Sequence, residues 1–121
     1  MKGKDMRFVL LLDFYGPMLT ERQQEAMEYY YDEDLSLAEI AQHTQITRQG
    51  VRDLIKRSEA ALLEMEERLG FLKRFEEMRV EVRKIKSASA EIGEINQNRF
   101  FSPQVRELVS EIDRLADRVL E

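Results

Sequence analysis

Several features that define common protein classes are missing from this chain of 121 residues. There is no cysteine, which excludes disulfides and thiolate metal sites and is compatible with a reducing compartment. The one histidine, His43, has no neighbouring ligand residue for a metal site, and a catalytic base needs a positioned partner. We therefore expect His43 to face solvent in a turn, and we expect neither a metal nor a cofactor.

Long apolar runs are absent as well. The longest, Phe8–Leu12, is far shorter than the roughly 20 residues of a membrane span, and the chain shows no signal-peptide cleavage region. We expect no membrane insertion and a cytoplasmic location. Glycine-rich phosphate loops, nucleophile elbows, zinc patterns and paired catalytic carboxylates are not found either, so nothing in the sequence supports an enzyme.

Proline and aromatic residues are scarce. Proline occurs only at positions 17 and 103, and aromatic residues make up 8% of the chain, against 36% for charged residues. This composition favours helices with solvated faces over a sheet protein. The fold class expected is all-α, as one compact domain or as a small domain with a helical appendage.

The middle of the chain has the layout of a helix-turn-helix. Ser36 and Glu39 form a capping-box pattern, which predicts a helix that begins at Leu37. Thr47 can cap a second helical run, which predicts a helix that begins at Arg48. Between them stands Gln45, which must adopt a left-handed conformation or belong to a different kind of turn.

The second of these helices is basic on its outward face. Arg and Gln near a helix N-terminus can read guanine and adenine edges in a major groove, while Lys and Arg further along can meet phosphates. The residues on this face are Arg48, Gln49, Arg52, Asp53, Lys56 and Arg57. The alternative is a solvated face, because Arg and Lys are also good helix formers at surfaces.

The charge of the whole chain opposes a simple DNA-binding protein. The net charge is −5, whereas nucleic-acid-binding domains are usually basic because neutralised phosphates supply most of the affinity. The segment Thr20–Ile46 contains seven carboxylates and a single basic residue, Arg22. We expect a monomer to bind weakly, so that a partner chain or a protein target must add to the affinity.

Two helices are predicted before the helix-turn-helix. One covers residues 6–15, with Asp5 as its cap and Gly16-Pro17 at its end. The other covers residues 21–31 and begins with a capping box at Thr20.

Beyond Thr47, apolar residues recur at intervals of three and four positions, over a stretch longer than a recognition helix requires. This spacing predicts a long helix with a coiled-coil-like seam. A monomer this small would not cover it fully, so we expect a homodimer with this seam in the interface. The predicted dimerisation residues are Leu62, Met65, Leu69 and Leu72.

The C-terminal part is predicted to be a helical tail. The apolar stripe shifts phase at Gly70, which predicts a bend or a change of partner. Small and polar residues over 86–90 predict a helix end or a joint, and Ser102-Pro103 predicts the start of a final helix with one apolar face. We expect a helix-turn-helix domain with a long helix over 1–75 and a tail over 76–121 for dimerisation or partner binding.

Short motifs in the first three quarters of the chain carry a resemblance to a known family. They are Asp13-Phe14-Tyr15, Leu19-Thr20-Glu21-Arg22-Gln23, Tyr29-Tyr30-Tyr31, Asp34-Leu35-Ser36-Leu37, Glu39-Ile40-Ala41 and Ile46-Thr47-Arg48-Gln49-Gly50-Val51. Together they resemble the YlxM family of small bacterial proteins. The Leu-Thr start and the helix-turn-helix are also similar to region 4 of bacterial sigma factors, which reads a promoter element in a major groove.

The YlxM resemblance implies an all-helical, usually dimeric protein without a winged helix, which serves the signal recognition particle pathway. Genes of this family typically lie beside that of the particle's GTPase. The comparison with sigma region 4 implies a nucleic-acid face that also includes the capping threonine. Its residues here are Thr47, Arg48, Gln49, Arg52, Lys56 and Arg57.

Three functions are compatible with the sequence. The resemblance favours an accessory factor that acts on the RNA or the GTPase of the signal recognition particle. The basic helix favours a homodimeric DNA-binding transcription regulator, which the acidic surroundings oppose. In the third, the helix-turn-helix is vestigial and the protein is a helical adaptor whose seam binds partner helices.

Overall fold

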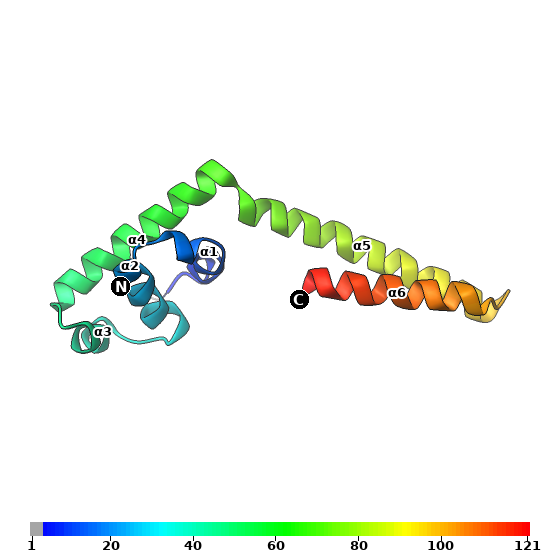
Figure 1. Ribbon diagram of the computed structural model, residues 1–121, viewed down its shortest axis with the longest axis horizontal. Helices are drawn as coiled ribbons and strands as arrows, with labels where there is room; N and C mark the ends of the chain where they lie inside the picture. Colours follow the sequence, from blue (N-terminus) through cyan, green and yellow to red (C-terminus); the bar gives the residue numbers. More distant parts are fainter. Residues whose placement is uncertain (1–3) are drawn as a thin grey trace. The chain divides into compact units, whose positions relative to one another are not determined.

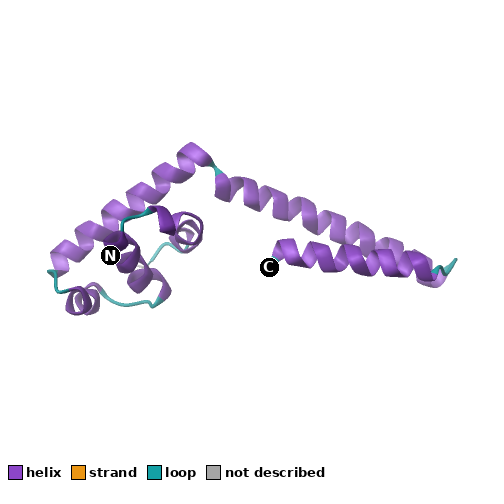
Figure 2. Ribbon diagram, in the orientation of Figure 1, coloured by secondary structure: helices purple, strands orange, loops and turns teal. Residues whose placement is uncertain are grey.

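The computed structural model describes residues 4–121, and its regular structure in that range is entirely helical (Figures 1 and 2). The expected all-α fold class is confirmed. The α-helices are α1 (Arg7–Tyr15), α2 (Glu21–Met27), α3 (Leu37–Thr44), α4 (Arg48–Leu69), α5 (Phe71–Asn98) and α6 (Pro103–Leu120). A 3-10 turn, η1 (Gly16–Met18), follows α1, and a π-helical turn, η2 (Glu28–Asp32), extends α2.

The chain divides into two compact units, each with its own packing. Residues 4–72 form the first, called the head below, and Lys73–Glu121 form the second, called the hairpin. The boundary thus lies after Leu72, whereas the sequence predicts it after residue 75. No helix in the described range has the length and apolar character that a membrane crossing requires.

Side-chain caps set the helix starts in the head. The Thr20 hydroxyl accepts from the Gln23 amide at 3.2 Å, and the Gln23 side chain accepts from the Thr20 amide at 3.1 Å. The first helix begins at Arg7, one residue later than predicted, and the Asp5 carboxylate accepts from the Arg7 amide at 2.9 Å. These bonds satisfy amides that every helix leaves free in its first turn.

The core of the head lies between α4 and the three helices before it. Four residues of α4 have no exposed surface, and their spacing by three and four places them on one stripe. They are Val51, Ile55, Ser58 and Leu62. This stripe packs against α1, α2 and α3, which supply the rest of the buried cluster together with Leu19 and η2.

The seam predicted for dimerisation therefore has an intrachain role. Leu62 is completely buried in the head, while Met65, Leu69 and Leu72 are partly buried against the same core. A homodimer stays a prediction, but Leu62 has no exposed surface to contribute to it.

The helix break expected near Gly70 is present. Gly70 adopts a left-handed conformation with φ of 63°, ends α4, and is followed at once by α5. Glycine is favoured there because a side chain at positive φ costs energy.

The joint predicted over residues 86–90 is wrong, because α5 runs through it without interruption. These small residues instead allow a close approach of α6. Ser89 is only 4% exposed, and a Cβ atom added at Gly93 would lie 3.1 Å from Cγ1 of Val109. Small residues on a helix signal close packing as readily as they signal an end.

Candidate nucleic-acid interface

The helix-turn-helix forms as the sequence predicts. Ser36 and Glu39 exchange both capping-box hydrogen bonds, at 3.1 and 3.0 Å, and α3 begins between them. The Thr47 hydroxyl accepts from the Gly50 amide at 2.9 Å and caps α4. Gln45 takes the left-handed conformation, with φ of 63°, and ends α3.

Apolar contacts hold α3 against the start of α4. Ile40 of α3 and Val51 of α4 are fully buried, and Ala41, Ile46 and Leu54 are partly buried around them. Because this side of α4 faces the core, the other side of its first turns is left to solvent.

The residues predicted to bind nucleic acid lie on that solvent side. All of them are exposed: Thr47, Arg48, Gln49, Arg52, Lys56 and Arg57. Within residues 4–121 none of the four basic side chains is ion-paired with a carboxylate. Arg48, Arg52 and Lys56 are four residues apart, so their side chains follow one line along the helix.

Two of the predicted residues also have structural roles. The Thr47 oxygen is used in the cap of α4, so its first contribution is to helix geometry. The amide of Gln49 donates to the Asp53 carboxylate at 3.1 Å on the exposed face. Asp53 therefore orients the one neutral side chain that could read a base edge, and it also places a negative charge among the basic residues.

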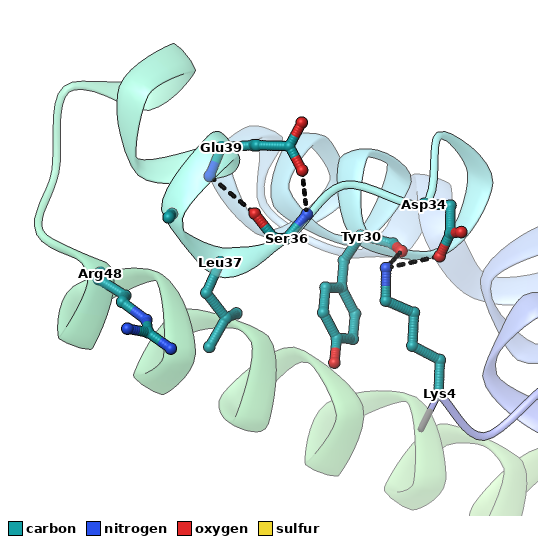
Figure 3. Close-up of a pocket in the computed structure, with 8 residues that line it drawn as sticks. Lys4, Tyr30, Asp34, Ser36, Leu37, Glu39 and Arg48 are labelled. Atoms are coloured by element: carbon teal, nitrogen blue, oxygen red, sulfur yellow. Dashed lines mark hydrogen bonds and ion pairs between the residues drawn. The ribbon is translucent and has the colours of Figure 1, made fainter. Parts of the chain in front are cut away.

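An open pocket of about 460 Å³ lies beside Arg48, at the start of α3. Arg48 and Lys4 lie at opposite ends of it (Figure 3). Lys4 Nζ is already engaged by the carbonyl oxygens of Tyr30 at 2.6 Å and Leu35 at 3.0 Å and by the Asp34 carboxylate at 2.9 Å. Arg48 is thus the cation of this pocket that remains available to a ligand.

The same pocket has acidic groups in its lining. The backbone and hydroxyl of Ser36 hydrogen-bond to the Glu39 carboxylate and lower its pKa, so this group stays charged near neutral pH. Asp34 is also exposed and lies close to Lys4. A phosphate that approaches Arg48 from this side meets carboxylates as well as the guanidinium.

A second depression, of about 250 Å³, shows a basic residue that sequence reasoning did not assign to the site. Arg22 of α2 lines it together with Arg57 and Asp53 of α4. Two arginines from different helices therefore line one depression at the edge of the interface. The only sequence signal was that Arg22 is the single basic residue of an acidic segment.

His43 differs from its expected position. It lies in the last turn of α3 and not in the turn after it, and it is exposed as predicted. Its ring stacks on Tyr29 with 5.2 Å between ring centroids.

Comparisons with known proteins identify the family. Residues 2–99 match the family UPF0122, described as "Putative helix-turn-helix protein, YlxM / p13 like". This chain belongs to that family. The UPF0122 match covers the whole head and all of α5, so the resemblance to YlxM proteins is confirmed.

Individual UPF0122 relatives differ in how much of the chain they match. A protein of Symbiobacterium thermophilum is 64% identical over 66 residues, which cover 54% of this chain and 62% of that protein, less than two thirds of its length. A protein of Thermoanaerobacter sp. is 43% identical over 87% of this chain and 86% of its own. A protein of Bacillus cereus strain AH187 is 39% identical over 95% of this chain and 99% of its own.

Proposed function

We propose that this chain binds nucleic acid through the start of α4 and acts as an accessory factor of the signal recognition particle pathway, on the particle's RNA or its GTPase. One observation supports nucleic-acid binding above all. Arg48, Arg52 and Lys56 form an exposed line of cations that has no carboxylate partner in the described chain. Side chains of this kind contribute affinity when they neutralise phosphates.

The acidic surroundings favour a mixed RNA and protein target over a long duplex. Asp34 and Glu39 line the same pocket as Arg48, so an extended row of phosphates would be repelled on one side. A complex that contains both RNA and a basic protein surface offers both signs of charge, and complementary charges make association faster and more selective. The major groove of A-form RNA is too narrow for α4, so these arginines would contact backbone, a loop or a widened site.

The second candidate is a DNA operator, and the helix-turn-helix itself favours it. Thr47 and Gln45 fix the turn between α3 and α4, and the outer side of the first turns of α4 faces solvent, as entry into a major groove requires. Arg48 and Gln49 would then meet base edges, and Lys56 a phosphate.

A binding experiment at matched salt separates the candidates. The full chain is titrated against particle RNA, the purified GTPase and a random pool of duplex DNA. A double variant, Arg48→Ala with Arg52→Ala, should lose affinity for the nucleic acid by at least about tenfold, since each side chain contributes about 1 to 3 kcal/mol. The matched control is Arg106→Ala with Arg114→Ala, which removes two exposed arginines of α6.

Each result has a definite meaning. Binding to the particle RNA or GTPase, lost in the α4 variant and kept in the α6 control, supports the accessory factor. If the protein selects one DNA duplex from the pool and binds neither the particle RNA nor the GTPase, the function is that of a transcription regulator and not of an accessory factor. Equal nucleic-acid binding by wild type and the α4 variant rejects the interface on α4 and favours the adaptor.

A further inference from the structure

At the end of the hairpin, the loop of residues 99–102 joins α5 to α6 (Figure 1). The Asn96 amide donates to the Ser102 carbonyl at 3.0 Å, and the Asn96 side-chain oxygen accepts from the Ser102 amide at 2.8 Å. The Ser102 hydroxyl accepts from the Val105 amide at 3.3 Å and caps α6. Asn96 is buried, and hydrogen bonds shielded from water are strengthened. The residues between Asn96 and Ser102 are therefore held in a defined turn.

Two phenylalanines in this loop have little contact with the rest of the chain. Phe100 is 86% exposed, more than any other large apolar residue in the described range, and Phe101 is 52% exposed. Neither belongs to the hydrophobic cluster of the head. Among residues 4–121 no other aromatic ring packs on either of them. Both rings are thus available to a partner, for which aromatic side chains offer a large contact area.

The loop also differs in charge from the chain around it. Arg99 is the only charged residue between Ile95 and Val105, although charged residues make up 36% of the chain. Its side chain is exposed and forms no ion pair with the described residues. No carboxylate in this stretch opposes a phosphate, whereas the basic side of α4 includes Asp53. The other exposed polar side chains near the loop are the amides of Gln97, Asn98 and Gln104.

Exposed aromatic rings beside an arginine are the combination that binds single-stranded nucleic acid. An unpaired base stacks on an aromatic ring, and a guanidinium meets a phosphate or stacks on a base itself. Amide side chains both donate and accept, so they can hydrogen-bond to the edges of the same bases. A regular duplex offers none of these stacking contacts, because its bases are already paired and stacked.

An anionic membrane surface fits the loop less well. Its charge would attract Arg99, and its apolar layer would accept both rings. The amides of Gln97 and Asn98 would then lose hydrogen bonds to water without a replacement, and burial of an amide without a partner costs free energy. Base edges and ribose hydroxyls supply that replacement.

We propose that Arg99, Phe100 and Phe101 bind unpaired nucleotides of an RNA, with one base stacked on each ring and a phosphate beside the guanidinium. This inference rests on the proposed function in that the ligand is an RNA. It adds a contact in the hairpin, a unit separate from α4, and it requires the RNA to contain a loop or another single-stranded segment.

A fluorescent reporter at the loop tests the contact in the full-length protein. The chain contains no tryptophan, so Phe100→Trp introduces a single indole that keeps an aromatic surface for stacking. The probes are a single-stranded RNA of mixed sequence and about 12 nucleotides, a blunt RNA duplex of the same length, and vesicles of phosphatidylserine. We expect saturable quenching by the single strand, and at least about tenfold weaker binding to the duplex.

Substitutions without the reporter separate stacking from general apolar contact. Phe100→Leu with Phe101→Leu keeps the loop apolar but removes both rings, and should weaken binding of the single strand by at least about tenfold. Phe100→Tyr with Phe101→Tyr should restore it. Arg99→Ala should lower the slope of affinity against salt by about one unit. Arg83→Ala, which removes an exposed arginine of α5 away from the loop, should leave this slope unchanged.

Three results overturn the proposal. They are equal binding of the single strand by the wild type and the double leucine variant, no quenching by the single strand, and an emission shift with vesicles or with protein concentration in place of quenching by RNA. The last of these would assign the rings to a membrane or to a second copy of the chain.

The reporter also separates this proposal from the proposed function. Arg48→Ala with Arg52→Ala, added to Phe100→Trp, should leave quenching by the single strand in place, because the loop is a distinct site. If particle RNA still binds through α4 but no single strand quenches the reporter, the loop contact alone is wrong. If quenching persists while the α4 substitutions leave binding of particle RNA unchanged, the interface on α4 is wrong and the loop contact stands.

Discussion

The Tyr15 hydroxyl donates a hydrogen bond to Oε1 of Glu66 at 2.5 Å, and this pair supports the point at which α4 ends and α5 begins. The Tyr15 oxygen also accepts from the Phe71 amide at 3.1 Å, and the same Glu66 oxygen accepts from the Leu72 amide at 3.0 Å. Two amides in the first turn of α5, which an isolated helix leaves free, therefore have side-chain partners. A residue at the end of α1 thus holds the first turn of a helix that begins 56 residues later.

Tyr15→Phe should lower the free energy of unfolding of the head by about 1 to 3 kcal/mol. The substitution keeps the buried ring and removes the donor to Glu66 and the acceptor for the Phe71 amide. Urea denaturation followed by circular dichroism measures the change. Tyr29→Phe is the control, because its hydroxyl makes no hydrogen bond within residues 4–121, and an equal loss in both variants would contradict the role of the Tyr15 hydroxyl.

The head should lose stability above about pH 10. Burial raises the pKa of Tyr15 and of Tyr31 above the ordinary value of 10.0, and hydrogen bonds to Glu66 and Glu59 raise both further. Above pH 10 the unfolded chain releases these protons while the folded chain keeps them. The free energy of unfolding therefore falls with rising pH, and the contribution is fully present below pH 10.

Denaturation midpoints from pH 7 to pH 11 test this dependence. A double variant, Tyr15→Phe with Tyr31→Phe, should show a shallower alkaline decrease than the wild type, even though it is less stable at pH 7. Parallel curves for the two proteins above pH 10 would show that other groups control alkaline unfolding.

Gln45→Gly should stabilise the helix-turn-helix, and Gly70→Ala should destabilise the end of α4. Both positions have φ of 63°, where a side chain costs about 1 kcal/mol. We expect the first change to raise and the second to lower the free energy of unfolding by about 0.5 to 1 kcal/mol. Thermal and urea unfolding measure the sign of the stability change in each variant. A Gln45→Gly protein that is less stable than the wild type would mean that this glutamine makes a compensating contact.

Arg22→Ala should weaken nucleic-acid binding although the residue lies outside α4. Its guanidinium lines the same depression as Arg57, so one phosphate contact should be lost and the slope of affinity against salt should fall by about one unit. Titrations at two salt concentrations measure this slope. Arg68→Ala, which removes an exposed arginine at the far end of α4, should leave it unchanged.

Features of the fold that depend on residues close in sequence could be predicted, and those that depend on distant ones could not. The capping boxes at Thr20 and Ser36 need only partners three residues away, and both formed as expected. The apolar spacing of α4 correctly predicted a stripe that packs against other helices. The spacing does not show whether those helices belong to another chain or, as at Leu62, to the same chain.

The same limit explains the remaining differences. Ser89 and Gly93 are small because α6 passes close to them, and that approach is invisible until both helices are placed. At the candidate interface, the basic side of α4 follows from helical periodicity alone. Arg22 reaches it only because α2 packs across α4, which no local pattern predicts.

One helix, α4, carries both the centre of the head's core and the candidate binding surface, on opposite sides. Its four fully buried residues, from Val51 to Leu62, cannot be exposed without separating α1, α2 and α3 from it. Amide protons along this stretch should consequently exchange with solvent only through global unfolding, and should be the slowest in the chain. A ligand bound to the outer side of α4 would stabilise the folded state and slow the exchange of these amides further. Hydrogen exchange of the buried side of α4 would therefore measure ligand binding to its exposed side.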